Sequence, residues 1–256
     1  MNPLLRNAVR RDDCACPGVS QTLPDFQFLS FVRPDYERAG IRLGEPAWEE
    51  LRASFFDLPV DTYLADGGSY RRRRFGRFSY DTTTGNLVSL ADKPFFQAPH
   101  FNRMNGGIQR RFAPLSAAIR QNRALRQLVR FHANALRLAC PDIAQWKVYV
   151  HQIRITASAD HRGKPAPEGV HQDGHYFVAQ VLIARENVTG AESRILSSDK
   201  DLIARTTLTQ PLDTLLVNDR AVFHEVTEIE AQAGDKSAYR DMLLIDFNPY
   251  DNSDEI

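Results

Sequence analysis

At residues 169–175 the chain reads GVHQDGH, and a second histidine, His224, follows in AVFHEVT at residues 221–227. His171 and Asp173 are two positions apart, so on an extended segment both side chains lie on the same face and can reach one cation. His224 lies in an alternating segment that predicts a strand, and it can supply a third ligand. Two histidines and one carboxylate on one face of an octahedral metal leave three positions open, as in non-haem iron(II) oxygenases.

A His-x-Asp pair is a weak signal by itself, because a polar turn before a strand reads the same way. Its weight comes from the later strand histidine and from Arg240, which follow in that order within a β-rich pattern. His151 and His161 are rival third ligands. No arginine follows His151 in a clamp position, and His161 lies in a polar loop. We expect His175 to line the pocket, with a structural role as the alternative.

Arg240 lies at the start of an apolar strand expected over residues 239–247. A guanidinium presents a planar fork that suits a carboxylate, and it is costly to bury without one. We therefore expect Arg240 to hold an acidic co-substrate beside the metal. The alternative is a structural ion pair with Asp246 or Glu225.

The composition indicates a folded protein that works in a reducing compartment. Of 256 residues, 43% are hydrophobic, which excludes disorder, and 32 Lys and Arg balance 32 Asp and Glu. This balance lacks the charge footprint of a nucleic-acid binder. Cys14, Cys16 and Cys140 form neither a disulfide framework nor a convincing zinc site. With no secretory signal or membrane-spanning run, we expect a cytoplasmic location and no membrane partner. Residues 1–23 predict a loosely held arm.

The first 140 residues predict helices and a small β extension. The pattern of residues 26–32 fits either a strand or a helix. We then expect a helix from residue 46, with Trp48, Leu51, Phe55 and Phe56 on one face. An extended segment is expected over residues 69–80, followed by a hairpin turn at 84–86 and a strand over 87–90. A second, longer helix is expected over residues 114–138.

The remainder of the chain predicts strands separated by polar turns. They are expected over residues 147–155, 176–184, 193–196, 202–208, 214–217, 222–229 and 239–247. Such a series favours a β-sandwich or jelly roll with flanking helices, a mostly β fold of the α+β kind. We expect one domain over residues 1–256, in which a helical and β extension (1–140) packs on the core that carries the metal site (141–250).

An arginine run at residues 71–74 resembles a nucleic-acid patch, but an extended segment would divide its arginines between two faces. We prefer arginines turned partly inward, which pair with acids or bind a substrate carboxylate. The candidates for that carboxylate are Arg154 and the arginines of residues 71–74, Arg74 among them. Gln152 and Arg154 share a face of the first core strand and are expected to line the pocket. Residues 105–112 predict a turn, with a substrate loop as the alternative.

Several motifs together resemble one known family. They are GVHQDG (169–174), NVTGAES (187–193), DTLLVNDRAVFH (213–224) and RDMLLIDF (240–247). As a set they are similar to the 2-oxoglutarate/iron(II) dioxygenases of the bacterial L-isoleucine 4-hydroxylase type, a group that includes relatives known through biofilm, stress or motility phenotypes. The likeness covers roughly residues 60–250, including the arginine run.

The resemblance implies a double-stranded β-helix (jelly-roll, cupin-like) core. It implies Fe(II) held by His171, Asp173 and His224 as the catalytic centre, and 2-oxoglutarate with its distal carboxylate on Arg240. Such an enzyme consumes O2, releases succinate and CO2, and hydroxylates or sulfoxidises a small substrate, here expected to be a free aliphatic L-amino acid. His175, Gln152, Arg154 and Arg74 are the candidate substrate contacts.

Some alternatives stay open at this point. A peptide or protein hydroxylase would keep the metal site, and a non-catalytic jelly-roll binding protein would keep only the fold. The oligomeric state is open, with a homodimer among the options. Met242 stands where many of these oxygenases have Ser or Thr two places after the arginine, so the wider anion clamp is open too. Tyr149, Tyr176 and Thr227 are candidates to supply that hydroxyl.

Overall fold

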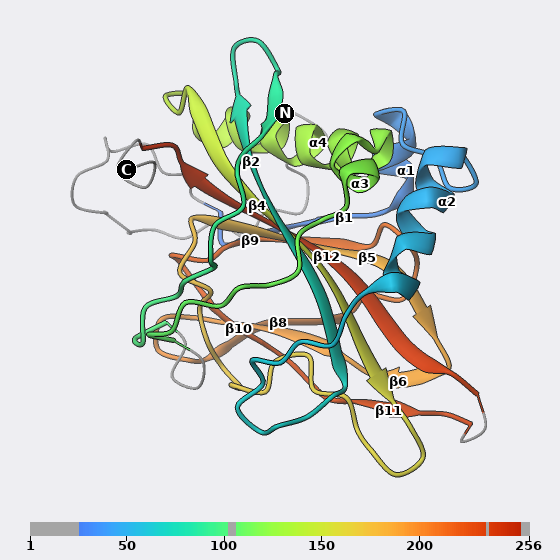
Figure 1. Ribbon diagram of the computed structural model, residues 1–256. Coiled ribbons are helices and arrows are strands. Elements are labelled where there is room, and N and C mark those ends of the chain that lie inside the picture. Colours follow the sequence, from blue (N-terminus) through green and yellow to red (C-terminus); the bar gives the residue numbers. More distant parts are fainter. Residues whose placement is uncertain (1–25, 102–105, 234–235, 252–256) are drawn as a thin grey trace.

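A seven-stranded antiparallel sheet contains the longest strands of the protein (Figure 1). β4 (Gln145–Ala157) pairs along its length with β2 (Arg71–Asp81) on one side and β12 (Ala238–Pro249) on the other. The strand order is β1-β9-β5-β12-β4-β2-β3. This computed structural model describes residues 26–101, 106–233 and 236–251, so the arm expected over residues 1–23, with Cys14 and Cys16, lies outside the described residues.

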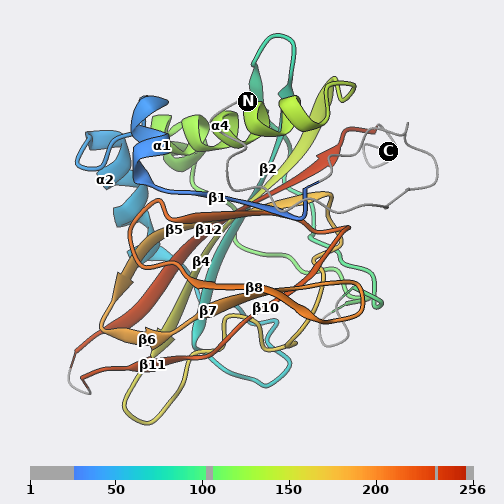
Figure 2. The same cartoon turned by 180° about the vertical axis from the view of Figure 1, so that it is seen from behind.

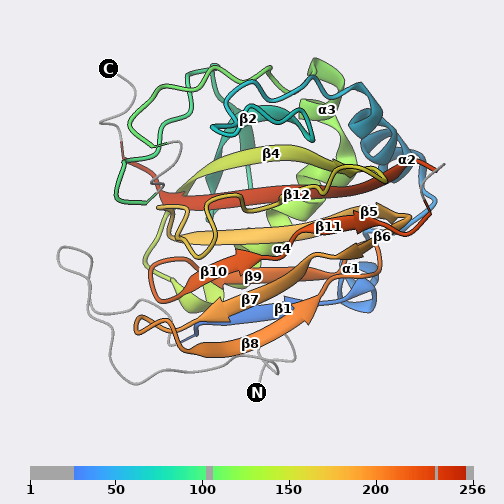
Figure 3. The ribbon, with the colours of Figure 1, turned by 90° about the horizontal axis from the view of Figure 1, so that it is seen from below.

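Shorter strands complete the large sheet and form two small ones. The large sheet also contains β1 (Phe28–Phe31), β3 (Leu87–Ser89), β5 (Phe177–Glu186) and β9 (Thr214–Asn218). One small sheet has the order β10 (Phe223–Val226), β7 (Glu192–Leu196), β8 (Leu202–Thr207), and the other pairs β11 (Ile229–Ala231) with β6 (Val188–Gly190). Figures 2 and 3 show the small sheets on one side of the large sheet, while the helices lie on the other side.

The helices form a layer over the large sheet (Figures 1 and 2). They are α1 (Arg33–Arg38), α2 (Pro46–Ala53), the 3-10 turn η2 (Ser54–Asp57), α3 (Ala117–Gln121) and α4 (Arg123–Ala139). In the described residues, none is both long enough and apolar enough to traverse a lipid bilayer. The result is the predicted mostly β fold with flanking helices, arranged as a jelly roll.

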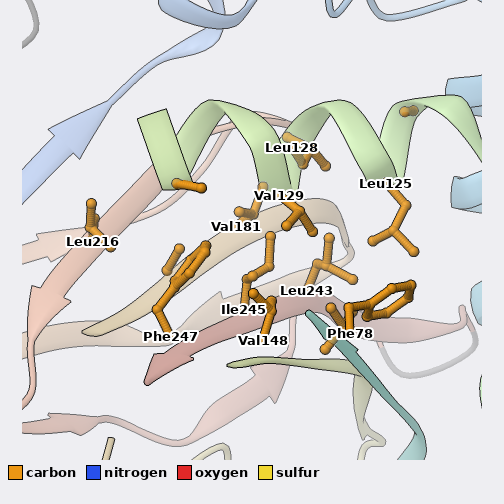
Figure 4. Close-up of a cluster of buried hydrophobic side chains, with 14 of the residues drawn as sticks. Phe78, Leu125, Leu128, Val129, Val148, Val181, Leu216, Leu243, Ile245 and Phe247 are labelled. Carbon is orange, nitrogen blue, oxygen red and sulfur yellow. The ribbon is translucent and has the colours of Figure 1, made fainter. Parts of the chain in front are cut away.

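The alternation of side chains along the long strands gives the large sheet one apolar face. Figure 4 shows Leu125, Leu128 and Val129 of α4 facing the sheet residues Val148, Val181, Leu243, Ile245 and Phe247, all of them fully or almost fully buried. Each such side chain contributes about 1.5–3 kcal/mol when it is removed from water. Because strand side chains alternate, Arg240, Met242, Leu244 and Asp246 of β12 point to the opposite face.

The N-terminal half settles one open alternative and departs from the expected elements in two places. The open stretch at residues 26–32 is strand β1, and α1 begins directly after it. The helix expected over residues 114–138 is two helices, because the chain turns at Asn122 (φ −58°, ψ 127°). Phe56, expected to be buried, is 62% exposed because α2 tightens into η2 before it.

Two expected strands also differ in detail. The strand expected over residues 222–229 divides into β10 and β11, which belong to different small sheets. The partner of β11, strand β6, was not expected, and it lies within the NVTGAES motif. The β segment before residue 140 is also more than an extension, because β2 pairs directly with β4 inside the large sheet.

Asn122 connects the two helices to α2, so its replacement should destabilise the fold. Its Oδ1 accepts from the backbone N–H of Leu125, while its Nδ2 donates to Ala47 O and to Glu50 Oε2, both at 2.8 Å. We expect Asn122→Ala to lower the free energy of unfolding by about 2–4 kcal/mol, since a cap and two further hydrogen bonds are lost. Urea denaturation measures this change.

Ser116→Ala is the matched control, because the exposed Ser116 caps α3 with a single bond to the backbone N–H of Ile119. It should cost about 1 kcal/mol. Equal losses in the two variants would contradict the connecting role of Asn122.

Candidate active site

The two histidines of the predicted triad are neighbours through their own backbone. The N–H of His171 donates to His224 O at 3.0 Å, and the N–H of His224 donates back to His171 O at 2.9 Å. Nε2 of His171 lies 3.5 Å from Oδ1 of Asp173, and Nε2 of His224 lies 3.2 Å from Oδ2. One ligand atom from each residue falls within 4.8 Å of the others, so a single ion can be reached by all three.

The loop that carries Asp173 is held by the side chain of Asp219. This role of Asp219 was not predicted from the sequence. The buried carboxylate of Asp219 accepts the backbone N–H groups of Asp173, Gly174 and His175 at 2.9, 2.8 and 3.1 Å. Gly174 has φ +84°, and an added Cβ would lie 2.6 Å from the ring of Phe101. A glycine is therefore required at this position.

Contacts of the Nδ1 atoms, a hydrogen bond at His171 and a longer polar contact at His224, direct the Nε2 atoms toward the carboxylate. Nδ1 of His171 lies 2.8 Å from Gly169 O, so Nδ1 carries a proton, and Nε2 is the nitrogen that can bind a metal once its own proton has left. Nδ1 of His224 lies 3.6 Å from Oδ1 of Asp219. Outer contacts of this kind orient metal-binding histidines in known sites.

The charges of the triad depend on one another. Burial opposes a charge on His171, but Asp173 and Glu168 outweigh it and raise the pKa of His171 to about 10. Against its own burial, hydrogen bonds from His171 and His224 hold the pKa of Asp173 well below its usual range. His171 is therefore an imidazolium at neutral pH in the metal-free protein, and its proton must leave when a metal binds.

Arg240 is buried in the same pocket, and no carboxylate of the described residues forms an ion pair with it. The residue is 3% exposed, and within the described residues its Nε and Nη2 have no hydrogen-bond partner. Asp246 lies beside His151 and His175, while Glu225 pairs with Arg194 at 3.1 Å, so neither makes the alternative ion pair. Burial, and then the nearby Arg185, lower the pKa of Arg240 to about 9. A carboxylate ligand would offset the cost of burying the Arg240 guanidinium.

The triad and Arg240 line one pocket, together with His175. His175 lies there as expected, with its Nε2 3.3 Å from Oδ2 of Asp246; its contact with a substrate stays a prediction. His151 also faces the pocket, but it bonds to Arg73 and is not a member of the triad. Apolar side chains complete the walls, including Ile153, Ile155, Val226, Met242 and Leu244.

Three residues expected to line this pocket do not, and that expectation is wrong. Strand alternation turns His151, Ile153 and Ile155 of β4 to the pocket, so Gln152 and Arg154 face the helices. Gln152 donates to Ser54 Oγ at 2.7 Å, and Arg154 makes two 2.7 Å bonds to Asp241. Arg74, also on the helix side of its strand, pairs with Asp57 at 3.1 Å.

The arginine run, expected to turn partly inward, and the segment of Arg110, expected as a turn or a substrate loop, instead supply pocket residues, and Gln97 was not expected. Arg71 and Arg73 of β2 line the pocket, as do Gln97 and Arg110. The signal in the sequence was the alternation within residues 71–74, but the phase of that alternation depends on the pairing of β2 with β4. None of Tyr149, Tyr176 and Thr227 lines the pocket, whereas Gln180 does.

A jelly roll with two histidines and an aspartate converging beside a buried arginine defines the class of non-haem iron enzymes that use an acidic co-substrate. Residues 52–246 match the family model described as 2OG-Fe dioxygenase, so the chain belongs to this family. Its members use Fe(II), 2-oxoglutarate and O2, and this protein is a 2-oxoglutarate-dependent non-haem iron dioxygenase. The predicted family and enzyme class are confirmed.

Individual relatives agree with this assignment. A crystal structure of a bsmA homolog from Methylobium petroleophilum PM1 is 30% identical, covers 87% of this chain and 88% of its own, and has a TM-score of 0.78. A 3(1)-hydroxy-L-isoleucine 4-dioxygenase from Pantoea ananatis (strain AJ13355) is 26% identical over 202 residues, or 78% of this chain and 80% of the relative. The structure of IDO from Bacillus thuringiensis, 20% identical with a TM-score of 0.72 and covering 88% and 95% of the two chains, supports the fold alone.

The raised pKa of His171 makes metal binding dependent on pH. Because His171 holds a proton below about pH 10 in the metal-free protein, one proton should be released for each Fe(II) bound at neutral pH. The apparent affinity should rise about tenfold per pH unit between pH 6 and 8. Anaerobic calorimetry in buffers of different ionisation enthalpy counts the protons. His161→Ala, in an exposed loop, should behave as wild type, and an affinity that does not change with pH would contradict the protonation of His171.

Asp219 should control metal affinity without touching the metal. In Asp219→Asn, the side-chain NH2 would face backbone N–H groups, and two donors cannot form a hydrogen bond. The loop of Asp173 would therefore be held less firmly. We expect Fe(II) to bind about 10- to 100-fold more weakly. Asp213→Asn is the matched control, because Asp213 accepts backbone N–H groups of Thr209 and Gln210 in a turn outside the pocket. Equal iron affinities in wild type and the Asp219 variant would refute this role.

Proposed function

We propose that this dioxygenase oxidises a free aliphatic L-amino acid at an iron centre formed by His171, Asp173 and His224, with the distal carboxylate of 2-oxoglutarate on Arg240. The observation that carries the proposal is the guanidinium of Arg240, which is buried without an anion in the pocket of the triad. A buried cation of this kind is costly for the fold and suits a dicarboxylate co-substrate.

The residues of the pocket have separate tasks in this proposal. Iron with 2-oxoglutarate and dioxygen supplies the oxidising power to hydroxylate a C–H bond or sulfoxidise a thioether, with succinate and CO2 as by-products. Gly169 and Asp219 orient the ring of His171 and the loop of Asp173. Arg240 binds and orients the co-substrate. The apolar walls exclude water and give an aliphatic chain a surface to contact.

The substrate class rests on two supports. The pocket wall contains Ile153, Ile155, Val226 and Leu244, which suit an aliphatic side chain. The curated relative from Pantoea ananatis carries the name of a hydroxy-L-isoleucine dioxygenase, and it is 26% identical to this chain. A peptide hydroxylase would use the same iron site, and turnover of a free amino acid in a screen decides against it.

Removing the charge of Arg240 should weaken the binding of 2-oxoglutarate and increase the stability of the fold. With Arg240→Met, we expect the visible charge-transfer band of the anaerobic Fe(II)–2-oxoglutarate complex to need at least about tenfold more 2-oxoglutarate, because a charged hydrogen-bonded pair is lost. The same variant without ligands should unfold at equal or higher urea concentration than wild type, since an unpaired buried charge is removed. His224→Ala should abolish the band.

Arg205→Met is the matched control, because Arg205 is exposed on β8, and it should alter neither measurement. A destabilised Arg240→Met variant that binds 2-oxoglutarate normally would assign Arg240 a structural role. A well-folded wild type that forms no band would sink the proposed site.

A further inference from the structure

Three buried arginines lie together on one wall of the pocket, away from the strand of Arg240. Arg71 and Arg73 come from β2, and Arg110 comes from the segment that follows residue 106. Their exposed fractions are 5%, 8% and 2%. We call Arg71, Arg73 and Arg110 the arginine cluster. The proposed iron site and the binding of 2-oxoglutarate at Arg240 do not use it.

Among the described residues, Asp61 is the carboxylate in ion-pair distance of the arginine cluster, while Glu168, Asp173 and Asp246 act on it from farther away. Oδ2 of the buried Asp61 accepts from Nε of Arg71 at 2.8 Å and lies 3.9 Å from Nη1 of Arg73. Arg73 otherwise bonds to the neutral Nδ1 of His151, at 2.8 Å from Nη2, and Arg110 bonds to the amide oxygen of Gln97. Buried cations are costly unless an anion accompanies them, so these guanidinium groups favour a further anion at this wall.

Unused donors remain on the arginine cluster. Within the described residues, Nη2 of Arg71 and Nε of Arg110 are buried with no hydrogen-bond partner. Burial, and next the charge of Arg71, lower the pKa of Arg73 to about 9, and the same two causes lower the pKa of Arg110. The guanidinium groups therefore repel one another, and a bound anion would relieve that repulsion.

Aromatic rings and a glutamine hold the cluster in place beside the metal loop. Cζ of Arg73 lies 4.3 Å from the centroid of Phe112, and Cζ of Arg110 lies 4.9 Å from that of Phe95. Gln97 accepts from Arg110 and donates to Asp173 O at 2.8 Å, so it connects the cluster to the backbone of a proposed iron ligand. An anion on the cluster is thus positioned near the reacting centre.

The register of the sheet separates the cluster from Arg240. Ile155 of β4 pairs with Arg240 on one side and with Arg71 on the other. Two strand spacings place the Cα atoms of the two arginines about 10 Å apart. Arg240 and the cluster thus enter the pocket from strands that are not neighbours, and we assign a separate anion to each. The proposed function uses only the site at Arg240.

We propose that Arg71, Arg73 and Arg110 bind the carboxylate of the primary substrate and orient its carbon chain toward the triad. This inference rests on the proposed function and deepens it: the substrate is a small molecule with a free carboxylate, as in an unmodified amino acid, and not an internal residue of a peptide. The cluster then discriminates an amino acid from its amide by charge, because a neutral amide leaves the buried guanidiniums unpaired.

The test removes a charge either from the protein or from the substrate and compares the effects on KM. Wild type, Arg73→Gln and Arg110→Gln are screened for succinate release with the twenty common L-amino acids, and each active compound is repeated as its carboxamide. In wild type we expect the KM of the amide to exceed that of the acid at least tenfold. Each variant should raise the KM of the acid at least tenfold. It should change the KM of the amide little, because the amide already lacks the carboxylate with which the arginine interacts.

Two further measurements separate this inference from the proposed function. The concentration of 2-oxoglutarate that gives half of the charge-transfer band should stay within about twofold of wild type in both variants. Arg72→Gln is the matched control, because the exposed Arg72 belongs to the same run but donates to Leu58 O away from the pocket. It should change neither KM nor the band.

Several outcomes would overturn the inference. It fails if the variants leave the KM of the acid unchanged, or if they weaken the binding of 2-oxoglutarate instead. It also fails if no compound with a free carboxylate stimulates succinate release while wild type still forms the charge-transfer band. Loss of the band in wild type is a different failure, because that result rejects the proposed iron site itself.

Discussion

The pairing of β4 with β2 and β12 is the constraint on which the rest of the structure depends. These strands alternate their side chains in phase, so one register decides the two faces of the sheet at once. On one face Val148, Leu243 and Ile245 pack under α4, and on the other His151, Arg73 and Arg240 line the pocket. A slip by one residue would bury the arginines under the helix and turn the apolar core toward the metal.

This constraint explains which parts of the molecule could be predicted from its sequence. The strands after residue 146 follow from their period of two, and the fold class follows from their number and short turns. The triad was predictable because His171 and Asp173 are close in the chain and His224 lies in a recognisable motif. Local pattern and motif order were sufficient for these features.

The remaining parts depend on contacts that no local pattern contains. Gln152 and Arg154 share a face, as expected, but which face meets the pocket is decided by the pairing of β4 with both neighbours. The break at Asn122 depends on hydrogen bonds to Ala47 and Glu50, more than seventy positions away in the chain. Asp219 holds three backbone N–H groups, and nothing around it in the sequence points to that role.

The same register also leads to a pocket in which opposite charges are kept apart. His151 stands between Arg73 and Asp246: its Nδ1 accepts from Arg73, and its Nε2 lies 3.2 Å from Oδ2 of Asp246. Burial, and then Arg73, hold the pKa of His151 well below its usual range, so the imidazole is neutral. Burial raises the pKa of Asp246 to about 7, and the neutral ring stands between this group and Arg73, so the two do not meet in a direct ion pair. Had Arg73 and Asp246 met, each would have satisfied the other, and the guanidinium would have less to offer a ligand. The neutral histidine between Arg73 and Asp246 thus keeps this buried arginine available to bind an anion.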